Sequence, residues 1–296
     1  MQDPVIVKST GGPTYNFAAA IDDALMDITI VLRGDEHLQN TPVQMAIVDA
    51  LGLRAPRYAH VPLILNEQHQ KLSKRHDTVS VEEFREVGIL PEAMIDHLVL
   101  LGWSAPDGRE EFTLDDLVRQ FSLERVQKGG AIFNEGRLLA FNARALRKLP
   151  RETRIERLRA AMARWGYDET PDWVGTFTDA YGEELQTLEQ ARPLVTALHA
   201  DAIRIPSDEH DLLAQPAVRD LLQALGERSV AEAPRAIPEL ATRFGLDRKQ
   251  AYHAVRIALT GQERGAPLAL LFPLLGESRI HARLAAARNQ GAATAR

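Results

Sequence analysis

The stretch that decides the fold is residues 28–37, ITIVLRGDEH. Residues 28–32 are all apolar or β-branched, which predicts a strand buried on both faces of a parallel sheet. A cluster of charged and polar residues, 33–37, follows directly. Because open α/β sheets bind ligands at the carboxyl ends of their strands, we expect a ligand site in this cluster. The alternative is a polar loop whose charges pair with one another.

A helix and a second strand follow the cluster. Thr41 and Pro42 provide an N-cap and a first-turn proline for the helix. Residues 58–65 are predicted to form the next strand, in which Pro62 weakens one ladder position. After a short polar turn comes the basic pentamer KLSKR, residues 71–75. The order strand, cluster, helix, strand, pentamer predicts that the cluster and the pentamer lie at the same edge of a sheet.

The basic pentamer is suited to a triphosphate. Lys71 and Lys74 would stabilise the charge that develops on a pyrophosphate leaving group. The Ser73 hydroxyl would donate to phosphate oxygens, and Arg75 would hold the loop or reach a phosphate through its planar fork. The alternative is a solvated basic loop, which short clusters of lysine and arginine commonly form.

Composition limits the class of protein. The chain has 296 residues and no cysteine, which excludes disulfides and cysteine-ligated zinc. No apolar run has the length of a membrane span and no charged-then-apolar leader opens the chain, so we expect a cytoplasmic protein without a membrane partner. A net charge of −6 argues against indiscriminate coating of nucleic acid, although local basic surfaces remain possible.

Helical signals dominate after about residue 70, and no convincing strand follows. Thr113 and Asn134 are predicted to cap two of these helices. Two regions are rich in basic residues, and each is either a solvated helix face or an RNA contact. The first contains Arg144, Arg147, Lys148, Arg151, Arg154, Arg157 and Arg159, and the second, from residue 241 onward, contains Arg248, Lys249 and Arg256 among others.

Several motifs in order resemble those of bacterial glutamyl-tRNA synthetases, which are class I aminoacyl-tRNA synthetases. They are GPTYNFA at 12–18, RGDEH at 33–37, NTP at 40–42, KLSKR at 71–75, LPEA at 90–93, LLGWS at 100–104 and ALTG at 258–261. The resemblance covers nearly the whole chain. It implies a mainly α fold with a partial α/β part, the latter being the C-terminal half of a class I Rossmann-like catalytic domain.

The resemblance also implies four parts. Residues 1–77 would be the C-terminal part of the nucleotide-binding catalytic domain, 78–145 a helical tRNA stem-contact region, and 146–205 and 206–296 two helical anticodon-binding subdomains. The family's His-Ile-Gly-His motif lies in an N-terminal half that this sequence does not contain. We therefore expect the chain alone to be inactive or very weak, with an apolar sheet face and an edge exposed.

The implied activity is the activation of glutamate by ATP and its transfer to tRNA(Glu), with Mg²⁺ at the phosphates and no protein-bound zinc. Motif positions imply the role of each residue. Tyr15 and Arg33 would bind glutamate; Glu36, His37, Leu72 and Lys74 would bind ATP; Lys71, Ser73, Lys74 and Arg75 would be catalytic; and Arg144, Arg147, Lys148, Arg248, Lys249 and Arg256 would bind tRNA. His60 is expected to have no special role.

Two functional hypotheses remain open, with an unrelated helical protein as a third. The first is a monomeric enzyme portion that is active only with a separate N-terminal half. The second is an inactive truncated relative that binds tRNA or a protein partner. Near Glu184 the family commonly has an arginine that reads the last anticodon base, so a glutamate there predicts weakened or relocated anticodon discrimination.

Overall fold

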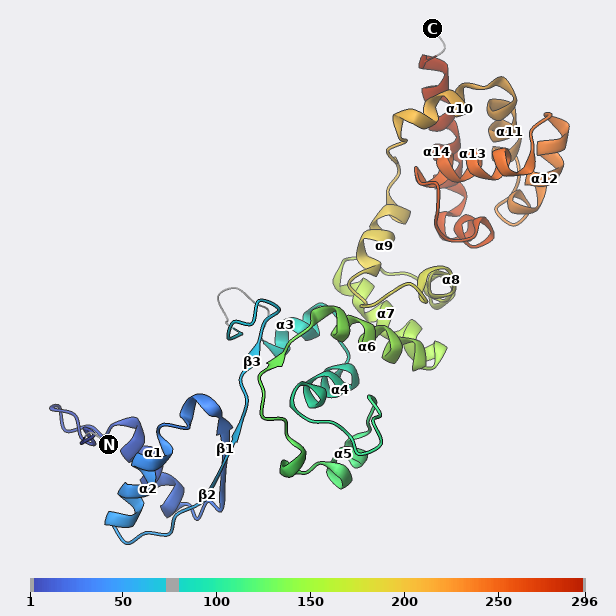
Figure 1. The fold of residues 1–296 in the computed structure, drawn as a ribbon. Coiled ribbons are helices and arrows are strands. Elements are labelled where there is room, and N and C mark those ends of the chain that lie inside the picture. Colours follow the sequence, from blue (N-terminus) through green and yellow to red (C-terminus); the bar gives the residue numbers. More distant parts are fainter. Residues whose placement is uncertain (1–2, 73–79, 295–296) are drawn as a thin grey trace. The chain divides into compact units, whose positions relative to one another are not determined.

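The structure is a computed structural model that describes residues 3–72 and 80–294, with side-chain surroundings up to residue 289. The chain divides into two compact units, whose elements are labelled in Figure 1. Unit 1 contains Met1–Phe84 and Pro91–Phe141, and unit 2 contains Arg85–Leu90 and Asn142–Arg296. The finer division into four parts stays a prediction.

The α/β part of unit 1 begins at α1 (Tyr15–Leu25). It continues with β1 (Ile30–Gly34), the short 3-10 helix η1 (Asp35–His37), α2 (Thr41–Ala50) and β2 (Arg57–Val61). The two strands pair in parallel, in a register that runs from Ile30 opposite Arg57 to Gly34 opposite Val61. The helices pack on each other around Ala20, Ile47 and Val48. The predicted strand–helix–strand order is therefore confirmed.

The prediction that residues 28–32 are buried on both faces is wrong. Ile28 and Ile30 are each 37% exposed and Leu32 is 48% exposed. Alternate residues of a strand share a face, so these three side chains form one exposed apolar face, which we call the open face. In the described part of the chain β1 pairs with β2 only, and two helices and two strands are too few to cover both faces. The expected exposed face and edge are confirmed.

The predicted strand 58–65 is divided at Pro62. Its first part is β2, and its second part is β3 (Ile64–Leu65), which pairs in parallel with β4 (Ala131–Ile132). Proline has no N–H to donate, so the ladder stops there and the chain changes partner. The existence of β4 corrects the expectation that no strand follows residue 70. A strand of two residues shows no alternation in the sequence, and so periodicity does not reveal it.

The remaining elements of unit 1 are helical, and the last of them ends in unit 2. They are α3 (Val81–Glu86), α4 (Pro91–Gly102), α5 (Leu114–Gln120), η2 (Leu123–Arg125) and α6 (Glu135–Lys148). The predicted cap of α6 is confirmed, because the Asn134 side chain accepts from the Arg137 N–H at 2.7 Å.

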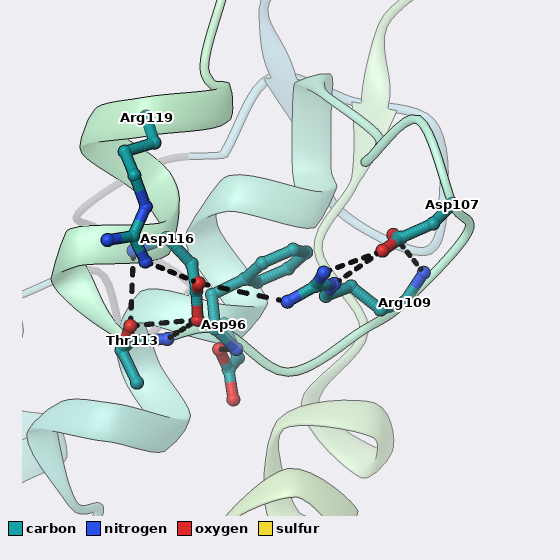
Figure 2. Close-up of polar contacts among 7 residues, drawn as sticks. Asp96, Asp107, Arg109, Thr113, Asp116 and Arg119 are labelled. Carbon is teal, nitrogen blue, oxygen red and sulfur yellow. Dashed lines mark hydrogen bonds and ion pairs between the residues drawn. The ribbon is translucent and has the colours of Figure 1, made fainter.

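The predicted cap of α5 is also confirmed. Thr113 and Asp116 form a reciprocal capping box, and Figure 2 shows the Asp116 carboxylate between Thr113 and the guanidinium groups of Arg109 and Arg119. Hydrogen bonds from Thr113, followed by that from Arg119, lower the pKa of Asp116 to about 2. The Asp96 carboxylate accepts from the Phe112 N–H at 2.9 Å and thereby anchors the segment that leads into α5.

His97, on α4, is only 2% exposed. Its ring meets Phe133 edge-on at 4.7 Å and Phe141 at 6.2 Å, measured between ring centroids. Neither ring nitrogen has a hydrogen-bond partner among the described residues. Burial, with a smaller contribution from the positive charge of Arg137, lowers the pKa of His97 to about 4.

We expect unit 1 to lose stability in acid because of His97. In the unfolded state His97 becomes protonated below about pH 6.5, whereas in the folded state it stays neutral until about pH 4. The free energy of unfolding therefore decreases as the pH falls from 6.5 to 4. At pH 5 the decrease amounts to about 2 kcal/mol relative to pH 7. Urea unfolding followed by fluorine NMR of fluorotryptophan would isolate Trp103 of unit 1. His97→Leu should lack this pH dependence, and an equal slope in both proteins would contradict the prediction.

Unit 2 is helical throughout its described part, as predicted. After the end of α6 it contains α7 (Arg151–Arg164), α8 (Pro171–Tyr181), α9 (Ala191–His199), η3 (Ser207–Glu209), α10 (His210–Ala214), α11 (Pro216–Gly226), α12 (Ala233–Arg243), α13 (Arg248–Thr260) and α14 (Leu268–Thr294). α14 is kinked at Gly276, where φ is 72°. One continuous core, from Leu158 to Ala287, joins these helices.

A buried asparagine fastens the short segment Arg85–Leu90 to unit 2. The side chain of Asn142 is fully buried; it accepts from the Leu90 N–H at 2.7 Å and donates to the carbonyls of Gly88 at 3.1 Å and Gln186 at 2.6 Å. Gly88 has a φ of +87°, and a Cβ on it would lie 2.9 Å from the backbone nitrogen of Leu188. This close approach requires glycine.

Candidate active site

Arg33 lies at the carboxyl end of β1, directly opposite His60 of β2 in the strand register. Its Nη2 donates to the Thr41 hydroxyl at 2.8 Å and faces the His37 carbonyl at 3.5 Å. Its Nε faces Nε2 of His60 at 3.5 Å, and the guanidinium lies 5.2 Å from the centroid of the Tyr58 ring. The guanidinium is thus held on several sides by the first turn of α2, the end of η1 and strand β2.

His37 lies beside Arg33 and joins it to the start of α1. The rings of Tyr15 and His37 are 5.6 Å apart and tilted by 43°. Nδ1 of His37 is 3.1 Å from the Asn40 side-chain nitrogen, which donates to it. Tyr15 is 56% exposed, so much of its side chain faces solvent beside this group.

Glu36 and Lys71 form an ion pair at 3.3 Å across the carboxyl ends of the strands. Both side chains are partly exposed, so water and salt weaken the pair. A backbone hydrogen bond and then Lys71 lower the pKa of Glu36, whose carboxylate therefore stays charged. This carboxylate folds over Gly34, where a Cβ would come within 2.0 Å of its oxygen. Glycine at this position leaves room for the charged group.

A tight turn holds Lys71 at the start of the basic pentamer. The Asn66 side chain accepts from the N–H groups of Gln68 and Gln70, and the Leu72 N–H donates to the Ile64 carbonyl at 3.1 Å. Lys71 itself bridges to Leu65. The remaining predicted residues of the pentamer, Ser73, Lys74 and Arg75, lie outside the described residues.

The structure brings together five of the predicted site residues: Tyr15, Arg33, Glu36, His37 and Lys71. Leu72, half-buried, follows them at the start of the pentamer. The charged cluster and the pentamer meet through Glu36 and Lys71, but not at one edge of a single sheet as predicted, because the pentamer follows β3, which pairs with β4 and not with β1.

The basic residues predicted to bind tRNA lie on two helices of unit 2. On α6, Arg147 and Lys148 are exposed and Arg144 is half-buried. On α13, Arg248 and Lys249 are exposed in the first turn. Arg256 is half-buried and donates to the Ala266 carbonyl at 2.8 Å, so it fastens the loop after α13. Glu184 is exposed between α8 and α9.

Sequence reasoning missed His60 as a neighbour of the site, and although Asn40 and Thr41 belong to a recognised motif, it did not predict their contacts with His37 and Arg33. Thr41 was expected to cap its helix, whereas it is the first residue of α2 and its hydroxyl contacts Arg33 and His60. His60 was expected to have no special role, but the parallel register places it against Arg33. The predicted strand ends, 28 and 58, would pair His60 with Ile30, so the observed register was needed to bring His60 to Arg33.

The described residues contain no group of three or more histidine, aspartate and glutamate side chains suited to a metal ion. A Mg²⁺ ion that accompanies a nucleotide is held mainly by phosphate oxygens and water, and so it does not need such a group. No helix in the described ranges is long and apolar enough to cross a membrane.

Comparison with known proteins matches both parts of the chain. A family model described as tRNA synthetases class I (E and Q), catalytic domain, matches residues 1–140, and an anticodon binding domain model matches residues 153–288. Glutamate–tRNA ligase 1 of Rubrobacter xylanophilus is 40% identical over 298 residues, which cover 97% of this chain and 68% of that protein. The chain belongs to the glutamate–tRNA ligase family.

Other glutamate–tRNA ligases match the chain over a similar length. Glutamate–tRNA ligase 2 of Syntrophus aciditrophicus is 41% identical over 97% of this chain and 61% of its own length. A crystal structure of a glutamate–tRNA ligase from Elizabethkingia meningosepticum, in complex with its amino acid, matches with a TM-score of 0.82 and 26% identity. That match covers 98% of this chain and 62% of the other. The chain thus spans about three-fifths of the length of such relatives, and the predicted mainly α fold with a partial α/β part is confirmed.

Proposed function

We propose that this chain carries one part of the glutamate–tRNA ligase active site together with the helices that bind tRNA(Glu). The reaction is the ATP-dependent activation of L-glutamate and its transfer to tRNA(Glu). The observation that carries the proposal is the convergence of Tyr15, Arg33, Glu36, His37 and Lys71 at the carboxyl ends of a parallel strand pair. Such an edge is where open α/β sheets bind ligands.

Each group has a role that its chemistry supports. The Arg33 guanidinium would pair with the side-chain carboxylate of glutamate, next to the exposed side chain of Tyr15. The Glu36 carboxylate would accept from the substrate ammonium or the ATP ribose. His37 and Leu72 would border the ATP.

The basic pentamer would act on the phosphates. Lys71 and Lys74 would stabilise the charge that develops on pyrophosphate, and Ser73 and Arg75 would bind its oxygens. In the structure Lys71 forms an ion pair with Glu36. To bind Lys71, the triphosphate, which carries more negative charge than one carboxylate, would have to replace Glu36 as its partner. Mg²⁺ is expected to accompany ATP.

Full activity would require the N-terminal part of the relatives that this sequence does not span. The open face formed by Ile28, Ile30 and Leu32 supports this requirement, because parallel sheets are normally covered on both faces. The chain's match to about three-fifths of its relatives agrees with it. We propose that the chain has the four parts predicted from the sequence, with residues 1–77 in the catalytic domain.

The test is glutamate-dependent ATP–pyrophosphate exchange with tRNA(Glu) present. The chain alone should show very little exchange. Mixing it with a separately produced N-terminal half should restore exchange, and Lys71→Met in the mixture should remove most of it, by about a hundredfold or more. Arg235→Gln, at an exposed position on α12 to which no binding role is given, is the control and should leave exchange unchanged. Exchange that stays absent in the mixture would contradict the enzymatic proposal.

A second candidate function is tRNA binding without catalysis. Unit 2 favours it, because its core is continuous and its helices match the anticodon binding domain, whereas unit 1 exposes the open face. Binding of tRNA(Glu) should weaken steeply with salt and should weaken further in Arg248→Gln. Glu184→Arg should strengthen binding of tRNA(Glu) over a tRNA that differs in the last anticodon base. Unchanged binding in Glu184→Arg would contradict the idea that anticodon discrimination is weakened at this position.

A further inference from the structure

The Arg33 guanidinium has two edges that can meet a carboxylate, and the protein occupies one of them. The side edge, made by Nε and Nη2, faces His60 at 3.5 Å and Thr41 at 2.8 Å, with the His37 carbonyl at 3.5 Å from Nη2. One planar face lies against Tyr58. No hydrogen bond within the described residues involves Nη1. Among the described residues Nη1 has no partner, and Nη2 has only the long contact with the His37 carbonyl besides its bond to Thr41, so the end edge made by Nη1 and Nη2 is the one left for a ligand.

The hydrogen-bond chain behind this edge has a defined direction. The Thr41 hydroxyl accepts from Arg33, so its own proton points either to His60 Nε2 at 3.2 Å or to the His37 carbonyl at 3.4 Å. Nε2 of His60 faces two donors, the Arg33 Nε–H and the Thr41 hydroxyl. Nε2 therefore lies where it can accept from the Arg33 Nε–H.

We propose that Thr41 and His60 are positioning residues that fix the Arg33 guanidinium, so that only its end edge is offered to a substrate carboxylate. The proposal rests on the assignment of Arg33 to the glutamate pocket. A fixed two-donor edge fits the two oxygens of a carboxylate. An amide presents one oxygen and one NH₂ group to the same edge, and the NH₂ group would face a donor. Fixing this edge therefore favours binding of L-glutamate over L-glutamine. If the guanidinium could rotate, it could adapt to the amide and the preference for L-glutamate would be smaller.

The substitutions that test the proposal change one contact each. Thr41→Val keeps the shape of the side chain and removes the hydroxyl, whereas Thr41→Ser keeps the hydroxyl. His60→Leu removes the acceptor opposite Arg33. The first readout is the exchange with water of the Arg33 Nε–H, followed by NMR on the whole chain and assigned with Arg33→Lys. Exchange should be slow in the wild type and in Thr41→Ser, and faster by about tenfold in Thr41→Val and His60→Leu.

The second readout is titration with L-glutamate and with L-glutamine in the mixture with the separately produced N-terminal half, observed on the same signal. Thr41→Val and His60→Leu should each lose about tenfold in affinity for L-glutamate with little change for L-glutamine, while Thr41→Ser retains the wild-type preference. Unchanged Nε–H exchange in Thr41→Val, or an unchanged preference for L-glutamate, would overturn the proposal. If the wild type holds Arg33 but does not respond to L-glutamate, the glutamate pocket of the proposed function fails and the fixing of Arg33 stands.

Discussion

Replacing Arg283 by methionine is expected to lower the free energy of unfolding of unit 2 by about 3 kcal/mol. Arg283 lies on α14 and is 2% exposed. Its Nη1 donates to the Leu259 carbonyl at 2.7 Å, and its Nη2 to the carbonyls of Ala197 at 2.7 Å and Ala200 at 2.5 Å. These acceptors lie at the carboxyl ends of α13 and α9, where the helix dipoles favour a positive charge. Methionine has a similar length but leaves the buried carbonyls unpaired.

The loss is moderated because methionine also removes a costly buried charge. Burial itself lowers the pKa of Arg283, and no carboxylate of the described residues forms a salt bridge with it. Urea unfolding followed through the fluorine signals of Trp165 and Trp173 would measure the effect. Arg279→Met is the matched control, since half-buried Arg279 makes one bond outside its own helix, to the His199 carbonyl at 3.2 Å. Equal losses in the two variants would contradict the special role of Arg283.

Replacing Gly261 by alanine is expected to cost a similar amount, about 3 kcal/mol, for a different reason. Gly261 ends α13 with a φ of 67°, which is unfavourable for any residue that has a Cβ. A Cβ there would also lie 2.2 Å from the Arg204 carbonyl oxygen, so either α13 or the segment before η3 must move.

Gly245→Ala separates these two contributions. Gly245 has a comparable φ of 72°, and nothing lies within 4 Å of the position of its Cβ. It should therefore show the backbone cost alone, about 1 kcal/mol. The difference in unfolding free energy between the two variants, measured on the same fluorine signals, gives the cost of the clash. If Gly261→Ala is no more destabilising than Gly245→Ala, the close approach to Arg204 does not constrain the fold.

The sequence predicts local features well because their partners are close along the chain. The caps at Thr113 and Asn134 depend on residues three positions away, and both are present. Pro62 correctly indicates a weak ladder position, but the new partner of the strand, β4, comes from a distant part of the chain. No local pattern predicts that exchange.

In the candidate site, too, the sequence predicts local features but not tertiary contacts. The strand order predicts that Glu36 and Lys71 lie close together, while their contact at 3.3 Å depends on side-chain conformations that no pattern specifies. His60 approaches Arg33 through the register of two strands separated by a helix. Arg256 looks like an available cation in the sequence, yet it donates to the Ala266 carbonyl. Tertiary partners therefore decide which of the predicted charged residues is engaged with the protein.

The anchoring of Leu90 and Gly88 by Asn142 limits how this protein can exchange modules with others. The three hydrogen bonds belong to unit 2, but two of their partners precede Pro91–Phe141 of unit 1 in the chain. A chimaera joined at residue 142 would inherit Asn142 without the segment that satisfies it. A single recombination point between the two units that keeps the three bonds intact must lie before residue 88, and it therefore transfers residues 91–141 together with unit 2.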